Sequence, residues 1–274
     1  MVIQHNMTAA NTNRQLGITT GNLAKSTEKL SSGYRINRAG DDAAGLSISE
    51  KMRGQIRGLD QASTNAQDGI SMIQTAEGAL AETQSILQRM RELTVQAAND
   101  TNVSTDRKAI AEEVSALTDE ITRIATQTEF NTMKLLSGGL KNKSLQVGAN
   151  AGQTINFSIK AMDSQALGVT SVADGIKTKT ASGISKLIST VNTALNKVST
   201  QRSALGALQN RLEHTITNAD NTSENLQAAE SRIRDVDMAS EMVKYSKNNI
   251  LQQAAQSMLA QANQSTQGVL SILG

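Results

Sequence analysis

The sequence predicts a mainly α-helical fold: a long coiled-coil-like helical rod with a small β-hairpin insertion and with its N- and C-terminal helices paired. Two observations lead to this prediction. The 274 residues contain no proline, although average usage of about 5% would place roughly 14 in such a chain. Because proline interrupts helices and favours turns, its absence suits long, continuous helices. Apolar residues also recur at alternating intervals of three and four, which is the spacing of a coiled-coil seam.

The first long helix is expected over residues 46–98. Its seam begins upstream with Ile48 and becomes regular from Ile73 to Ala97. The next residues, Asn-Asp-Thr-Asn at 99–102, favour a turn and an N-cap. A second helix should follow, with these apolar residues on one face: Ile110, Val114, Leu117, Ile121 and Ile124. We expect the two helices to form an antiparallel hairpin.

The longest seam lies in the C-terminal half of the chain, from Leu187 to Val236. It holds the alternation over about 50 residues, which corresponds to roughly 75 Å of helix at 1.5 Å per residue. Helices of globular proteins usually run about 8–20 residues, so this length indicates a rod.

The residues between the helical blocks follow a different pattern. Apolar and polar residues alternate over 145–149 and 155–159, and Asn-Ala-Gly-Gln at 150–153 separates the two stretches. Alternation with period two around a short polar turn predicts a β-hairpin. We therefore expect residues 137–185 to form a small β-containing insertion between helices.

The composition argues against several classes of function. With no cysteine, the chain forms no disulfide or thiolate metal site, and we expect no metal and no cofactor. Its 27 basic and 25 acidic residues are dispersed, which gives no electrostatic reason to expect nucleic acid or a membrane as partner. Aromatic residues make up only 1% of the chain, so little is available to build an enzyme pocket. The N-terminus does not resemble an ordinary secretory signal. We predict no catalytic residues and no enzymatic activity.

Both ends of the chain are apolar at helical spacing yet almost free of charge. Residues 248–274 contain no charged side chain, and residues 1–24 contain only Arg14 among arginine, lysine and acidic residues. An exposed helix normally carries charges on its wet face, so a polar but uncharged face suits a helix surrounded by other protein. The expected polymerisation core consists of the periodic apolar residues Leu16, Leu23, Leu30, Leu251, Ala255, Met258, Ala262, Val269 and Leu273.

The ends also lack the apolar content to fold alone. Ordering residues 1–39 costs more conformational entropy than their few large apolar side chains can offset. We expect each end to be disordered or marginal in the monomer, and to become helical on packing against the other end and against neighbouring copies. The alternative is a tail that never orders, as chain termini often do.

Six stretches of this sequence resemble bacterial flagellin. They are KLSSGYRINRAGDDAAGLSISEKMRGQIRGL (29–59), QTAEGAL (74–80), LQRMRELTVQAAND (87–100), LGALQNRLEHTI (205–216), AAESRIRDVDMASEM (228–242) and NNILQQAAQSMLAQANQSTQGVLSILG (248–274). The resemblance covers both helical blocks and both ends, and it places the insertion only weakly. Because that insertion is small, the chain resembles the short type of flagellin, which lacks large variable outer domains.

The resemblance implies a structural subunit of the flagellar filament that self-assembles through its terminal helices into a hollow helical propeller for motility. It also implies an extracellular location, with export by the flagellar secretion apparatus and no cleaved signal peptide. Residues 1–39 and 236–274 would form the inner domain, and residues 40–235 the rod domain. The implied partners are other copies of the chain, an export chaperone, and the hook–filament junction and cap proteins.

Two further surfaces follow from the resemblance. Matching positions in related flagellins are bound by vertebrate Toll-like receptor 5, and the same positions would pack neighbouring subunits: Gln88, Arg89, Arg91, Glu92, Leu93 and Glu113. Arg89 and Leu93 share a helix face, which indicates partial burial against a partner. The export chaperone is expected to hold periodic apolar anchors of the C-terminal segment, by helix-in-groove recognition: Leu251, Met258, Leu259, Val269 and Leu270.

Some of these features allow other interpretations. A cytoplasmic helical scaffold or signalling rod is the alternative function, but a soluble rod keeps charges beside its seam. Asp41 and Asp42 could form a catalytic carboxylate pair, yet no histidine or acidic cluster is near them in sequence, so a solvated connector over residues 33–45 is preferred. Its three glycines, Gly33, Gly40 and Gly45, should let it bend. His5 and His214 fall in expected helices and are assigned structural roles.

Overall fold

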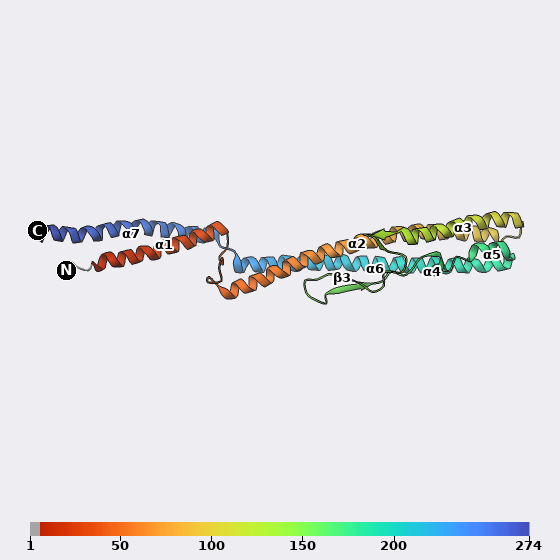
Figure 1. The fold of residues 1–274 in the computed structure, drawn as a ribbon, viewed down its shortest axis with the longest axis horizontal. Helices are drawn as coiled ribbons and strands as arrows, with labels where there is room; N and C mark the ends of the chain where they lie inside the picture. The colour runs from red at the N-terminus through yellow and green to blue at the C-terminus, as the bar shows by residue number, and fades with distance from the viewer. Residues whose placement is uncertain (1–5, 274) are drawn as a thin grey trace. The chain divides into compact units, whose positions relative to one another are not determined.

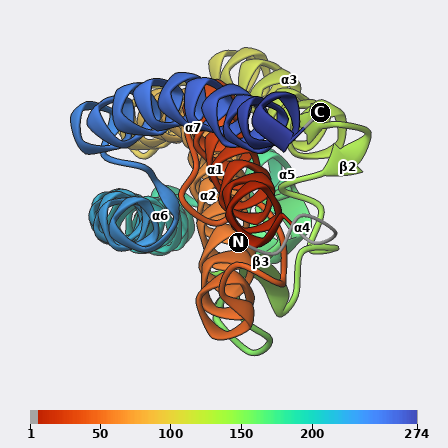
Figure 2. The same ribbon diagram turned by 90° about the vertical axis from the view of Figure 1, so that its left-hand side faces the viewer.

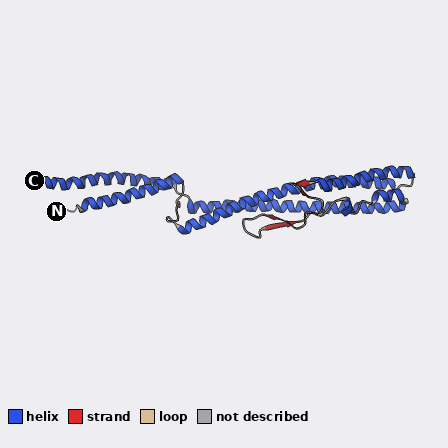
Figure 3. Cartoon of the chain, viewed as in Figure 1, coloured by secondary structure: helices blue, strands red, loops and turns tan. Residues whose placement is uncertain are grey.

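The computed structural model describes the backbone of residues 6–273 and the side chains of residues 6–264. It is mainly helical, with short strands in the middle of the chain (Figures 1 and 3). The helices are α1 (Met7–Ser32), α2 (Ala43–Ala97), α3 (Ser104–Gln127), α4 (Ser164–Leu167), α5 (Val172–Thr178), α6 (Ala181–Arg234) and α7 (Met238–Leu273). The strands are β1 (Glu129–Phe130), β2 (Met133–Lys134), β3 (Lys143–Gln146) and β4 (Thr154–Phe157).

The chain forms two compact units, and α2 and α6 contribute residues to both. The terminal unit comprises residues 1–54 and 224–274, and the central unit comprises residues 55–223. The three long helices α2, α3 and α6 confirm the predicted mainly helical fold.

The central unit has a continuous apolar core that α2, α3 and α6 share. The predicted seam positions supply it, and many of them are fully buried: Ile73, Leu80, Leu87 and Met90 from α2, Val114 and Ile121 from α3, and Val191, Ala194 and Val198 from α6. Arg202 of α6 also reaches α2, where its guanidinium donates to Gln84 Oε1 at 2.8 Å and to Glu77 Oε1 at 3.3 Å. The seam spacing therefore predicted which faces meet.

Polar residues in this seam keep their hydrogen bonds inside their own helix. Thr83 and Thr94 are almost fully buried, and their hydroxyls donate to the carbonyl oxygens of Ala79 and Met90, at 2.9 and 2.6 Å. A buried hydroxyl without a partner would be costly, so this bonding lets threonine take an apolar position in the core.

The seam of α2 is displaced by one residue at its start. Ile48, expected on the seam, is 46% exposed, whereas Ser49 is fully buried and donates to the carbonyl oxygen of Leu46. Counting back from Ile56 in steps of four and three reaches Met52 and Ser49, so the buried position falls on the serine. The apolar character of Ile48 alone was therefore misleading.

The predicted β-hairpin is present, with β3 and β4 antiparallel and Leu145 opposite Ile155. Two features of the stretch between α3 and α6 were not predicted. A second hairpin joins β1 to β2 through Asn131 and Thr132, both at positive φ. The short helices α4 and α5 also lie here, and neither is long enough to show a helical period in the sequence.

In the terminal unit, α1 and α7 run side by side, which Figures 1 and 2 both show. The expected pairing of the two terminal helices is therefore confirmed. Val236, expected to end the seam of α6, instead lies in the connection between α6 and α7, where its N–H donates to the carbonyl oxygen of Gly33 at 3.0 Å.

Candidate assembly surfaces

The seam between α1 and α7 is regular but half polar. Its members are the less exposed positions of each helix, and they alternate by three and four: Ala9, Thr12, Leu16, Thr19, Leu23, Ser26 and Leu30 on α1, and Glu241, Tyr245, Asn248, Gln252, Ala255, Leu259 and Ala262 on α7. Only Ser26 and Glu241 are buried, and the leucines are half-buried. The two helices alone therefore leave their seam partly open to water.

The residues predicted to form the polymerisation core fall into three groups. Leu16, Leu23, Leu30, Ala255 and Ala262 lie on the seam. Leu251 and Met258 lie outside it and are 45% and 63% exposed. Leu259, expected only as a chaperone contact, is on the seam. The side chains of Val269, Leu270 and Leu273 lie outside the described residues.

Leu251 and Met258 belong to a larger set of exposed apolar side chains on the terminal helices. Met242 is 53% exposed, Val243 70% and Ile250 67%, and Met7 and Ile18 of α1 are also uncovered. Grouped exposure of large apolar side chains marks surfaces that other molecules cover. These side chains form the uncovered apolar face of the terminal unit.

A buried polar contact fixes the register of α1 against α7. The hydroxyl of Ser26 donates to Glu241 Oε1 at 2.7 Å, and Lys244 Nζ lies 3.1 Å from Oε2. Burial raises the pKa of the Glu241 carboxyl, but the Ser26 hydrogen bond and the ammonium groups of Lys244 and Lys29 outweigh burial and hold that pKa below its ordinary value. This is the buried polar contact of the seam, and it specifies the register because any shift of one helix along the other leaves the buried charge unpaired.

The segment that follows α1 and the segment that precedes α7 run antiparallel to each other. Tyr34 and Asp235 form an antiparallel bridge, and Arg35 N–H donates to the carbonyl oxygen of Arg234 at 2.6 Å. The Arg234 guanidinium lies over the Tyr34 ring, 4.8 Å from its centroid, and pairs with Glu50 at 2.6 Å. This hydrogen bond holds the pKa of Glu50 below its ordinary value. The connection is therefore an ordered joint.

The glycines and aspartates of this connector have distinct roles. Gly33 ends α1 at a φ of 75°, as a bend requires. Gly45 was expected to bend the chain but lies buried in α2, where a Cβ would approach Asp42 Oδ2 to 2.5 Å, so it provides space for packing. Asp42 accepts from the Gly45 N–H, and Asp41 accepts from the N–H groups of Arg38 and Asn37, which lower the pKa of Asp41. Both carboxylates bind backbone N–H groups, as expected for a connector.

The predicted receptor or packing surface lies where α2 and α3 run together. Arg89 Nε donates to Glu113 Oε1 at 3.0 Å and its Nη1 to Glu92 Oε2 at 3.1 Å, and these carboxylates raise the pKa of Arg89. Gln88 and Arg91 are exposed. Leu93 differs from the expectation of partial burial against a partner: it is 2% exposed, because it packs inside the shared core of α2 and α3.

Among the described residues, no group of histidine or acidic side chains is arranged to hold a metal ion. No helix of the described part of the chain is long and apolar enough to cross a membrane. His214 lies exposed on α6, and His5 lies outside the described residues. Paired terminal helices with an uncovered apolar face are typical of a structural protein that assembles with copies of itself.

Comparison with known proteins gives the family. Residues 3–141 match the bacterial flagellin N-terminal helical region, and residues 188–273 match the C-terminal helical region. The chain is 58% identical to a flagellin of Halalkalibacterium halodurans and 54% identical to a flagellin of Bacillus subtilis, in each case over 100% of both chains. It is similar to the crystal structure of Bacillus cereus flagellin, with 30% identity and a TM-score of 0.50 over 57% of this chain and 88% of that one.

The chain therefore belongs to the bacterial flagellin family, and it is of the short type without a large variable domain. It is a structural subunit of the extracellular flagellar filament, in which copies of the chain polymerise.

Proposed function

We propose that this subunit polymerises through α1 and α7, whose uncovered faces pack against the same helices of neighbouring copies. The observation that carries this proposal is the exposed apolar set on these helices, Met242, Val243, Ile250, Leu251 and Met258, next to a tail without charge from residue 248 onward. Neighbouring helices would cover the apolar side chains, and amides and hydroxyls would find partners without burying an unpaired charge.

We infer further that α1 and α7 are only marginally stable in the free monomer. Their seam is half polar, and its leucines remain half-buried, so the pair gains little from apolar burial. Assembly would supply the missing contacts, and folding of the ends would be coupled to polymerisation.

Hydrogen exchange on dilute monomer, followed by magnetic resonance, tests this inference. Backbone N–H groups of α1 and α7 should exchange within seconds to minutes, while those of α2, α3 and α6 in the central unit stay protected. In filaments both sets should be protected. Slow exchange throughout α1 and α7 in verified monomer would overturn the inference.

The uncovered face of α7 also suits an export chaperone. Leu251 and Met258 are exposed and Leu259 is half-buried, and with Val269 and Leu270 they form the proposed anchors. The double variant Leu251→Asn/Met258→Asn should bind the cognate chaperone at least tenfold more weakly by calorimetry, whereas Ile18→Asn on α1 should bind normally.

Export is proposed to leave the N-terminus uncleaved, apart from the initiator methionine, and mass spectrometry of secreted subunits checks this.

A receptor-binding role is proposed for the exposed side chains around Arg89. Arg89, Glu92 and Glu113 form one charged cluster on α2 and α3, and Gln88 and Arg91 adjoin it. Toll-like receptor 5 would bind this surface on the free monomer, and neighbouring subunits would cover it in the filament. Leu93 would support the surface from the core and make no direct contact. Surface plasmon resonance with the immobilised receptor ectodomain should show that monomers bind and that intact filaments do not.

The remaining assignments complete this proposal. Residues 1–39 and 236–274 are proposed as the inner domain and residues 40–235 as the rod domain, so limited proteolysis should cut first outside the rod. Hook–filament junction and cap proteins are proposed partners at the two filament ends. The subunit is proposed to have no catalytic activity.

A further inference from the structure

A continuous groove follows α6 through the central unit. Three adjoining cavities form it, with volumes of about 740, 310 and 600 Å³. Gln201 lines both the first and the second cavity, and Arg211 lines both the second and the third. The α6 wall runs from Thr193 to Thr222, which is about 44 Å at 1.5 Å per residue. Residues of the insertion form the opposite wall.

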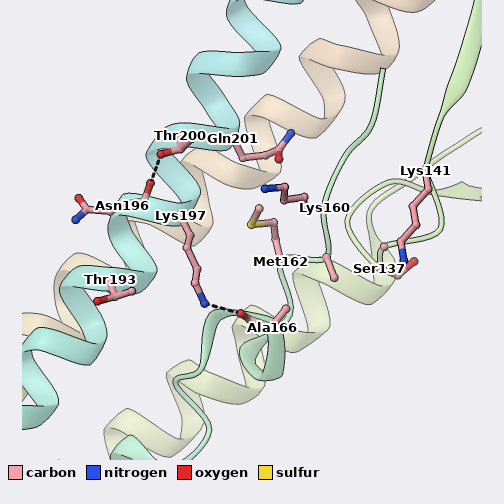
Figure 4. A pocket seen from close by; sticks show the side chains of 12 residues that line it. Ser137, Lys141, Lys160, Met162, Ala166, Thr193, Asn196, Lys197, Thr200 and Gln201 are labelled. Atoms are coloured by element: carbon pink, nitrogen blue, oxygen red, sulfur yellow. Dashed lines mark hydrogen bonds between the residues drawn. The ribbon is translucent and has the colours of Figure 1, made fainter. Parts of the chain in front are cut away.

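The groove is basic along its length. Its ionisable side chains are Lys141, Lys160, Lys197, Arg211 and His214, and among the described residues no aspartate or glutamate lines any of the three cavities. Figure 4 shows Lys197 reaching from α6 toward Ala166, whose carbonyl oxygen it contacts at 2.9 Å, with Lys160 on the facing wall. A long channel lined by one sign of charge attracts a partner of the opposite sign.

In the middle of the groove, the α6 wall between Gln201 and Arg211 carries small and apolar residues. Ala204 and Ala207 lie there, with Leu205 and Leu208 beneath them. Small residues allow a second helix to approach closely, and interhelical distances of about 8–10 Å depend on the side chains at the contact. The groove therefore suits a helix whose contact face is acidic and otherwise small.

Between Ala109 and Asp119 the outward face of α3 has this character, and Arg123, further along the same side of the helix, is paired with Glu120. Ala109, Glu112, Ala116 and Asp119 are all exposed, opposite the buried face of Ile110, Val114 and Ile121. Glu112 and Asp119 are seven residues apart and share one side of the helix. Neither forms an ion pair with another of the described residues. Helix α3 has 24 residues, about 36 Å, so it fits within the length of the groove.

We propose that the groove beside α6 binds the outward face of α3 from a second copy of this chain. Lys160 and Arg211 face Glu112 and Asp119 of the neighbour, and Ala204 and Ala207 lie against Ala116, which falls between these two acidic residues on α3. A groove on one side of the subunit and a complementary helix on another make a heterologous contact, which generates an open polymer when its rotation does not close. This inference rests on membership of a filament-forming family and is independent of the proposed role of α1 and α7.

Cross-linking tests the contact directly, because the natural chain has no cysteine. Filaments of the Ala116→Cys/Ala207→Cys chain should give a ladder of disulfide-linked oligomers under mild oxidation, and dilute monomer should give none. The matched control is Ala116→Cys/Ser199→Cys, since Ser199 is exposed on α6 but does not line the groove. Filaments that give no ladder with the groove pair, or equal ladders with both pairs, would overturn the proposal.

Charge exchange gives a second, independent test. The Lys160→Glu/Arg211→Glu chain should polymerise with a critical concentration raised about tenfold, which corresponds to about 1.4 kcal/mol per subunit. Adding Glu112→Lys/Asp119→Lys to the same chain should restore polymerisation, while circular dichroism confirms that all variants fold. Unchanged assembly of the first variant, or no rescue by the second, contradicts the contact. Loss of assembly on truncating α7 is unaffected by either result, so the two proposals fail separately.

Discussion

The terminal and central units use the same helical spacing but fill it with different residues. In the central unit, seam positions such as Leu80, Leu87 and Val198 are fully buried. In the terminal unit, the corresponding positions alternate between half-buried leucines and polar residues such as Thr19 and Ser26. Since apolar burial contributes about 25 cal/mol per Å², the central unit gains most of its stability within one chain. The terminal helices have a seam with the right spacing for pairing but with little driving force of its own.

The largest effect is expected when most of α7 is removed. Deleting residues 248–274 should abolish polymerisation, because α7 then lacks most of its seam with α1, and should leave the helicity of the central unit intact. Sedimentation and electron microscopy measure the first effect and circular dichroism the second. The full-length chain carried through the same refolding is the control. Filaments of normal stability from the truncated chain would contradict the role given to this end.

A charge placed in the terminal seam should have nearly the same effect on assembly. Ala255 and Ala262 are half-buried on α7, and Ala255→Asp or Ala262→Asp would bury a carboxylate at a cost of several kcal/mol once neighbours pack around it. Filament yield at neutral pH should fall to background. Ala255→Ser, which is close in size and uncharged, should assemble. Normal yield from the aspartate variants would show that the seam stays hydrated in the filament.

The same leucine-to-alanine substitution should lower the stability of the monomer by different amounts in the two units. Leu87→Ala, at a fully buried position, should lower the free energy of unfolding of the central unit by about 2–5 kcal/mol. Leu16→Ala, at a half-buried position of α1, should change monomer stability by less than about 1 kcal/mol. Urea titrations monitored by circular dichroism compare them. Similar losses at both positions would remove the distinction between the units.

The Ser26–Glu241 contact should make pairing of α1 and α7 sensitive to acid. The folded pKa of Glu241 lies below its ordinary value of 4.5, so this stabilisation is fully present above that pH and is lost as pH falls through the lowered folded value. Helicity of the terminal helices in filaments should therefore decline in that window. Glu241→Gln should flatten this dependence, and Ser26→Ala should weaken the pairing of α1 with α7 by about 1.5–3 kcal/mol through loss of a hydrogen bond to a charged group. An unchanged acid profile in Glu241→Gln would refute the assignment.

The smallest effect on stability is expected at the surface of the central unit. Arg89 and Glu113 are half exposed, and exposed ion pairs contribute little. Arg89→Ala/Glu113→Ala should therefore leave the thermal midpoint of the monomer within error, while weakening the proposed receptor binding by tenfold or more. Glu120→Ala, which removes another exposed pair on α3, serves as the control for both measurements. A large drop in thermal midpoint would assign the pair to stability.

Sequence reasoning was most successful where one period ran for many turns. The seam from Leu187 along α6 predicted both the helix and its buried face, and the alternation around Leu145 and Ile155 predicted the hairpin. Short elements escaped because α4 and the β1–β2 hairpin contain too few residues for any period to show. The prediction for Ile48 was wrong because the buried positions of a seam are set by the residues three and four away. Comparing Ile48 with Ser49 alone favours the apolar residue.

The candidate surfaces were predicted less completely than the fold. Leu93 has the same spacing from Arg89 that a surface residue would have, but the turn after α2 brings α3 back over it. Gly45 was assigned to bending because spacing alone does not reveal that Asp42 and Ile36 approach it closely. The basic groove beside α6 could not be inferred, because Lys141, Lys160 and Arg211 are far apart in sequence and join one channel only through the fold.

The joint at Tyr34 and Asp235 has a mechanical consequence. Two strands of chain pass through it in opposite directions, and the pairs Arg35–Arg234 and Gly33–Val236 tie them by their peptide groups. A force on either segment is therefore transmitted to the other, so neither segment can act as an independent hinge. Under the torque on a rotating filament, the two segments would therefore resist separation together. The two backbone hydrogen bonds between them would break in one event.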